Sequence, residues 1–184
     1  MQQGKVVAGT TNSELKRLSI TQNIEINDIS YKFSSRNVFD KFSMIVPTNF
    51  EELTSELAVT KYPLVSRPQI VLSNPDATVD VFFNCGVKKT HVSIADRMIL
   101  YKSVVKNLNS SYEFFTARAG SRLAYFDFRS YTIDSDMYNL WFLVDLPDNT
   151  IFGGFSCLIH WQLQWHVLAL QMLQTIAALP PNKE

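Results

Sequence analysis

This sequence of 184 residues contains few cysteines and few glycines, and its positive and negative charges balance. The two cysteines, Cys85 and Cys157, stand in apolar, strand-like contexts, which argues against a disulfide framework and favours reduced, buried thiols. Lys and Arg together number 17, and so do Asp and Glu. The chain therefore lacks the basic field that nucleic-acid binding requires, and we predict no nucleic-acid partner.

Long hydrophobic runs are also absent. The tract between Asp148 and Lys183 contains no charged residue, but polar residues interrupt its helical part: Gln162, Gln164, His166, Gln171 and Gln174. Because a membrane-spanning helix needs about 20 mostly apolar residues, we predict no such helix. The N-terminus has Lys5 but no apolar segment typical of a secretory signal. Together with the reduced cysteines, this predicts a cytoplasmic protein.

Signatures of catalysis are missing as well. The sequence has no phosphate-binding glycine loop, no nucleophile elbow and no His-Glu-x-x-His motif. Cys157, His160 and His166 are clustered, but they fall on a predicted strand, at its end and on a helix, and no third group is identified to orient a base. Asp127 and Asp145 could project from the sheet. We predict no catalytic, cofactor-binding or metal-binding residues, and a protein that is not an enzyme.

Residues 112–179 contain the clearest structural signals. Aromatic-rich runs at 112–118 and 122–132 flank a glycine turn, which predicts a β-hairpin. The run from Met137 to Asp145 is apolar on both faces, which is typical of a central strand. A fourth strand is predicted at 151–159, where Gly153-Gly154 indicates a bulge or a close backbone approach. Four strands with short connections predict an antiparallel meander.

Apolar spacing then changes to the period of a helix, with residues three and four apart on one face: Trp161, Trp165, Leu168, Met172, Ile176 and Leu179. This predicts a long C-terminal helix over 162–179, ended by Pro180-Pro181. A second helix is predicted from Ser93-Ile94-Ala95-Asp96, which resembles a capping box, with one apolar face: Ile94, Met98, Tyr101, Val105 and Leu108. Thr48-Asn49 followed by two glutamates predicts a third helix over 50–59.

The N-terminal half completes an α+β order. Strands are predicted around Ile24–Phe33 and Phe42–Val46 with a loop at 34–37, and at 69–73 and 78–84 around an Asn-Pro-Asp turn. We predict a flexible leader at 1–23, a single α+β domain at 24–180 and a tail at 181–184. The domain is expected to contain an antiparallel sheet of about six to eight strands, with helices packed on both faces.

Aromatic residues exceed what one sheet face needs. The chain has three Trp and thirteen Phe, and aromatic side chains that cannot all be buried mark interaction surfaces. We predict a protein partner bound by an aromatic surface of sheet and helix, with five candidate residues: Trp141, Phe128, Phe126, Trp161 and Trp165.

Two stretches and the order of elements carry a family resemblance. The strand ending at Met44–Pro47 precedes a helix, and the final strand runs through Phe155–Cys157 into a helix that bears Trp165 and Ile176. Over about 24–179 this resembles the Mog/PsbP-like superfamily, which includes the Ran release factor, PsbP, DcrB-like bacterial proteins and type VI effector chaperones. The resemblance implies a non-catalytic binding module such as a chaperone, adaptor or immunity-type protein; no functional residue is carried over.

Two alternatives stay open. One is a small-ligand-binding protein or enzyme with a pocket between the sheet and the C-terminal helix, which a cavity holding His160 or His166 beside a carboxylate would favour. The other is a homo-oligomer, such as a homodimer, that buries the C-terminal helix between subunits. The sequence does not determine the oligomeric state.

Overall fold

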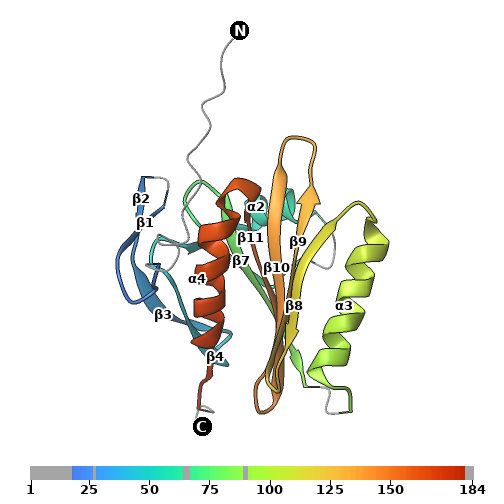
Figure 1. The fold of residues 1–184 in the computed structure, drawn as a ribbon. Coiled ribbons are helices and arrows are strands. Elements are labelled where there is room, and N and C mark those ends of the chain that lie inside the picture. Colours follow the sequence, from blue (N-terminus) through green and yellow to red (C-terminus); the bar gives the residue numbers. More distant parts are fainter. Residues whose placement is uncertain (1–17, 27, 64–66, 89–90, 181–184) are drawn as a thin grey trace.

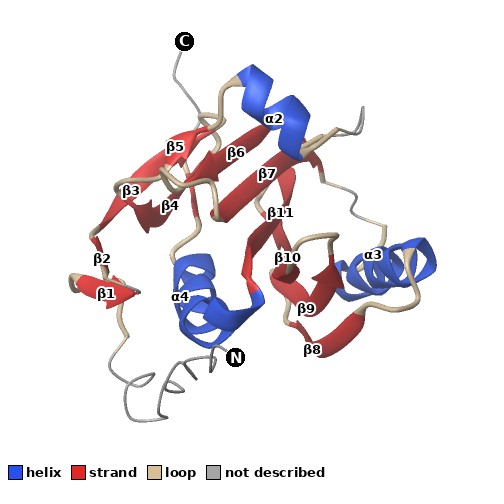
Figure 2. Ribbon diagram, turned by 90° about the horizontal axis from the view of Figure 1, so that it is seen from above, coloured by secondary structure: helices blue, strands red, loops and turns tan. Residues whose placement is uncertain are grey.

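A computed structural model describes residues 18–26, 28–63, 67–88 and 91–180. Its middle layer is a seven-stranded antiparallel sheet, with helix α4 and a small three-stranded sheet on one side and helices α2 and α3 on the other (Figures 1 and 2). This confirms the predicted single α+β domain, including the number of strands and the helices on both faces. None of the helices in the described part of the chain is long and apolar enough to cross a bilayer.

The large sheet has the strand order β5-β6-β7-β11-β10-β9-β8. Its C-terminal four strands form the predicted meander, and β7 pairs with β11 to bring the earlier hairpin into the same sheet. The strands are β5 (Glu51–Glu52), β6 (Ile70–Ser73), β7 (Val79–Val87), β8 (Glu113–Ala119), β9 (Leu123–Tyr131), β10 (Asp136–Asp145) and β11 (Asn149–Leu158).

Helix α4 (Gln162–Gln174), which follows a 3-10 turn η1 (Ile159–Trp161), packs over one face of this sheet. Trp165, Leu168 and Met172 are fully buried there against apolar side chains of β10 such as Leu140 and Phe142. The remaining strands surround the helix and close this main core: β1 (Ile24–Ile26), β2 (Ile29–Tyr31), β3 (Phe33–Val38), β4 (Phe42–Pro47) and β12 (Ala177–Ala178).

The opposite face carries α2 (Ser55–Lys61) and α3 (Ile94–Leu108), which lie apart from one another (Figure 2). Ser93 caps α3 as predicted, since its hydroxyl accepts from the Asp96 N–H at 3.1 Å and donates to the Asp96 carboxylate at 2.7 Å. Ile94, Met98 and Val105 pack on β9 and β10 and form a second, smaller core.

The last helix is shorter than predicted. It ends at Gln174 rather than at 179, and residues Ala177–Ala178 instead pair with β4. Thr175 provides the physical reason, because its hydroxyl donates to the Met172 carbonyl at 2.7 Å and accepts from the Ile45 N–H at 2.9 Å. These bonds satisfy a carbonyl of the last turn and attach the chain to β4, so the helix ends before the prolines.

Two predictions in the N-terminal half are wrong. The expected helix at 50–59 begins only at Ser55, capped by Thr54, because Glu51 and Glu52 pair with β6. The expected loop at 34–37 lies inside β3 (Phe33–Val38). The chain reverses only after this strand, at Phe39 and Asp40, where φ is 56° and 52°. Both positions adopt the left-handed conformation that tight hairpin turns require.

The predicted leader at 1–23 lies mainly outside the described residues, as does the predicted tail at 181–184. The described end of the leader packs on the main core through Leu18 and Ile20. Gln171 of α4 holds this segment with both ends of its amide: Nε2 donates to the Leu18 carbonyl at 2.9 Å, and Oε1 accepts from the Ile20 N–H at 3.1 Å. The boundaries of the leader and the tail stay predictions.

Candidate binding surface

A continuous series of aromatic rings crosses the sheet on the side of α2 and α3. Trp141 of β10 lies at its centre, with ring centroids 5.4 Å from Phe152, 6.3 Å from Phe82 and 5.6 Å from Phe128. Tyr101 of α3 stacks on Phe152 at 4.6 Å. These contacts combine offset stacks and edge-to-face pairs, the geometries that aromatic rings prefer.

Gly154 allows these rings to approach the sheet closely. A Cβ atom at this position would lie 2.2 Å from Cε1 of Phe82 and 2.9 Å from Cδ1 of Trp141. The two rings therefore cover the bare backbone of β11 from either side. Gly153 has the same role on the opposite face, where a Cβ would lie 2.3 Å from Cζ of Phe142. The predicted close backbone approach is confirmed.

Part of this aromatic surface remains open to solvent. Phe126 and Phe128 are buried, whereas Trp141, Phe152 and Tyr101 are only partly buried. We call these last three residues, with the nearly buried Phe82, the aromatic surface. Partly exposed aromatics beside a rigid sheet can contact a partner with little loss of side-chain entropy.

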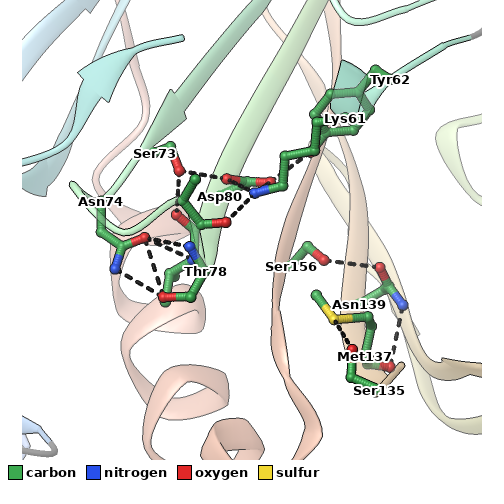
Figure 3. Close-up of polar contacts among 12 residues, drawn as sticks. Lys61, Tyr62, Ser73, Asn74, Thr78, Asp80, Ser135, Met137, Asn139 and Ser156 are labelled. Carbon is green, nitrogen blue, oxygen red and sulfur yellow. Dashed lines mark hydrogen bonds and ion pairs between the residues drawn. The ribbon is translucent and has the colours of Figure 1, made fainter. Parts of the chain in front are cut away.

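Polar side chains form the next row across the same face. Asn139 of β10 accepts from the Ser156 hydroxyl of β11 at 3.2 Å and donates to the Ser130 hydroxyl of β9 at 2.9 Å (Figure 3 shows Asn139 and Ser156). All three are partly exposed. The row is pre-organised by these bonds, and it offers hydroxyl and amide groups next to Trp141.

Asp80 of β7 anchors α2 beside this row. Its buried carboxylate accepts from Nζ of Lys61 at 2.7 Å, the hydroxyl of Tyr62 at 2.9 Å and the hydroxyl of Ser73 at 2.6 Å (Figure 3). Burial and the Asp80 charge raise the pKa of Tyr62. The Tyr62 ring lies 6.3 Å from that of Phe82, so this cluster fixes the C-terminal end of α2 against the aromatic surface.

Arg97 fixes α3 at the other end of the sheet. Its guanidinium donates to the Asp145 carboxylate at 2.6 Å and to the Thr150 hydroxyl at 2.9 Å. Burial opposes ionisation of Asp145, but the bonds from Arg97 and Thr150 outweigh it and lower the pKa of that carboxyl. Asp145 was predicted to project from the sheet, and in the structure its carboxylate attaches α3 to the sheet through Arg97.

The five predicted binding residues do not form one surface. The structure brings Trp141, Phe126 and Phe128 together on the α3 side. Trp161 and Trp165 lie on the α4 side, where Trp165 is 0% exposed among Tyr31, Phe50 and Phe155, and Trp161 is partly exposed. Trp165 belongs to the core pattern of α4, because the sheet covers the helix face that carries it and buries that side chain fully.

A polar network that sequence reasoning missed links α4 to the sheet. The Asp127 carboxylate of β9 accepts from the Thr116 N–H and hydroxyl, both at 2.6 Å, and from the Tyr138 hydroxyl at 3.1 Å. That hydroxyl lies 2.7 Å from Nδ1 of His166. Since the tyrosine gives its single proton to Asp127, Nδ1 of His166 donates to the tyrosine oxygen.

The surroundings of Asp127 favour its ionised carboxylate, so this charge stabilises the folded protein. The residue is 1% exposed, and burial opposes its ionisation, but the nearby His166, whose Nδ1 lies 3.4 Å from Oδ2, and the hydrogen bonds from Thr116 outweigh this and lower the pKa of the carboxyl. Burial and the Asp127 charge raise the pKa of Tyr138. Asp127, Tyr138 and His166 are far apart in sequence, so no local spacing could have revealed the network.

The gap between α4 and the sheet is lined by apolar residues, among them Leu140, Phe142 and Met172, and is too small for a water molecule. Cys157 is buried in β11, where burial raises the pKa of its thiol, and His160 is exposed. Within the described ranges, no group of three His, Cys, Asp or Glu side chains is placed to hold a metal ion.

The fold is similar to solved structures. Cyanobacterial PsbP (CyanoP) from Synechocystis sp. PCC 6803 matches over 80% of this chain and 92% of its own, with a TM-score of 0.59 and 8% identity. LpqN, involved in cell envelope biogenesis of Mycobacterium tuberculosis, matches over 95% of this chain and 100% of its own, with a TM-score of 0.56 and 10% identity. No family model and no curated protein matches the sequence. The chain has a PsbP-like fold, as the resemblance predicted.

Proposed function

We propose that the protein is a non-catalytic binding module that holds an apolar segment of a partner protein on the aromatic surface. The observation that carries this proposal is the position of Trp141. Its ring lies at the centre of the aromatic series and covers Gly154, yet neither α2 nor α3 buries it completely. Large, partly exposed aromatics of this kind are typical anchors of protein interfaces.

Helix α3 adds apolar side chains beside this surface. Leu100, Val104 and Leu108 recur every four residues and are exposed, Leu108 to 75%. The prediction that Leu108 lies on the buried face of α3 is therefore wrong. These residues share the flank of the helix that carries Arg97 and Tyr101, both of which contact β11. They extend the apolar area towards the part of the sheet that holds Trp141.

Charge and polarity support a protein rather than a metal or nucleotide as partner. Asn139, Ser130 and Ser156 provide neutral hydrogen-bonding groups at the border of the aromatic surface. An apolar centre with a polar rim is the usual anatomy of a protein interface. The nearby charges of Asp80 and Lys61 neutralise each other at 2.6 Å.

The test is affinity capture from the native host followed by mass spectrometry, with wild type and three variants of the protein. Trp141→Ala removes the anchor, and Asn139→Lys places a charge at the border without emptying the core. Trp161→Ala is the matched control, because this tryptophan is also partly exposed but packs on the α4 side. A stoichiometric partner retained by wild type and Trp161→Ala, and weakened by about 2 kcal/mol or more in Trp141→Ala, is expected.

Thermal unfolding of each variant separates loss of binding from loss of fold. The proposal fails if the partner binds both surface variants as tightly as wild type, or if Trp161→Ala abolishes capture while Trp141→Ala does not. It also fails if the purified protein carries a small molecule that Trp141→Ala leaves bound.

A further inference from the structure

The two edges of the large sheet differ in how they are protected. At one edge, β5 has only two residues, both of them exposed glutamates, and short or charged strands discourage further pairing. At the other edge, β8 has seven residues, six of them exposed, and among the described strands only β9 pairs with it. The outer backbone of β8 is thus a long edge with no strand beside it.

Beneath α3, this edge borders an open groove of about 130 Å³. Met98 and Phe126, both buried, lie deepest, while Ala117 and Ala119 of β8 and Ala95 of α3 contribute only methyl groups. Ile99, which is 64% exposed, also lines the groove. The small side chains leave space between helix and strand that an aliphatic side chain from outside can fill.

The charge of the groove is of one sign. Lys102 of α3 is the charged side chain that lines it, because the Arg118 side chain alternates with those of Ala117 and Ala119 and lies on the opposite face of the sheet, with its strand partner Tyr125. Within the described ranges Lys102 forms no ion pair, and its ammonium instead lies 5.1 Å from the centre of the Phe114 ring. Lys106 follows one turn later on the same flank of α3 and is exposed. An acidic segment is the complement of this surface.

The β8 strand is also held rigidly in place. The register shifts between Phe114 and Ala117, and at this irregularity the Thr116 N–H and hydroxyl both bond to the buried Asp127 carboxylate. A pre-organised edge lowers the entropy cost of adding another strand. Strand addition obtains affinity from main-chain hydrogen bonds and specificity from pockets for alternate side chains.

We propose that an extended segment of a partner protein, with an aliphatic residue and an acidic one two positions away, adds to the free edge of β8. The aliphatic side chain enters the groove between α3 and β8, and the acidic side chain, on the same face of the added strand, meets the positive charge of Lys102. This site is separate from the aromatic surface, because Ile99 and Lys102 lie on the opposite flank of α3 from Val104 and Leu108. It does not depend on the function proposed above.

The probe is a displayed library of short random peptides, selected on the full-length protein and then measured individually by fluorescence anisotropy. Selected peptides are expected to be rich in Asp and Glu two positions from Val, Ile or Leu. Lys102→Glu reverses the charge, and Ala117→Trp fills the groove; each is expected to weaken binding about tenfold or more. Lys32→Glu, at an exposed lysine between β2 and β3 and outside the groove, and Trp141→Ala are expected to leave binding unchanged.

Several results would overturn the proposal. The library could yield no peptide that binds above background, or peptides without acidic residues. Binding could persist in both groove variants, or depend on Trp141, which would place the peptides on the aromatic surface. Sedimentation that shows a dimer disrupted by Ala117→Trp would assign this edge to a second copy of the chain instead.

Discussion

Replacement of Asp127 by Asn tests whether a buried charge attaches α4 to the sheet. The carboxylate accepts three hydrogen bonds from the sheet, two from Thr116 and one from Tyr138, and its Oδ2 lies 3.4 Å from Nδ1 of His166 on α4. A hydrogen bond to a charged group contributes about 1.5–3 kcal/mol, against about 1 kcal/mol for a neutral one. The amide keeps the shape but removes the charge, so we expect Asp127→Asn to lower the free energy of unfolding by about 3 kcal/mol.

The effect depends on pH with a definite sign. The pKa of Asp127 in the folded protein lies below its unfolded value of about 3.9, so the carboxylate stabilises the fold above that pH. This contribution is lost as the pH falls through the folded pKa. Because the Asn variant cannot titrate here, the difference in stability between wild type and variant is expected to be complete near about pH 7 and to shrink below about pH 3.9.

Urea unfolding followed by tryptophan fluorescence measures this, since Trp165 is fully buried in the core that α4 closes. Asp148→Asn is the control, because that side chain is exposed in a turn, and it is expected to change stability by less than about 0.5 kcal/mol. A difference between wild type and Asp127→Asn that stays constant from neutral to acid pH would refute the role of the charge. Unchanged stability at neutral pH would refute the network as a whole.

Two further predictions concern packing. Gly154→Ala is expected to destabilise the fold by about 1–3 kcal/mol, because an aromatic ring lies 2.2 Å from the new Cβ; an unchanged midpoint of urea unfolding would contradict this. Gln171→Ala is expected to release the segment from Leu18 to Ile20, raising hydrogen exchange there while the exposed Gln174→Ala does not. Equal exchange in both variants would show that the amide does not hold the segment.

Local sequence patterns predicted most of the fold. Alternation in β10 identified both faces correctly, with Tyr138 and Leu140 towards α4 and Trp141 towards α3. The Ser93 cap and the four C-terminal strands were likewise predicted from neighbouring residues. These signals depend on contacts within a few positions of the chain, where period and capping chemistry act directly.

The candidate site was predicted only in part. Excess aromatic residues indicated an interaction surface, but the sequence could not show that Trp165 is fully buried while Trp141 remains partly open. The reason is that burial depends on which elements cover each face, and this is a property of the assembled layers. The binding role of the surface, the cytoplasmic location and the identity of any partner stay predictions.

The sequence by itself determined the α+β class, the order of most elements and which residues of each strand share a face. Tertiary structure alone decided where elements end and which distant groups meet. Thr175 stops α4 because Ile45 lies beside it, and Asp127 meets His166 because β9 and α4 pack together. Such contacts arise only when distant segments fold against one another, and no local pattern in the chain encodes them.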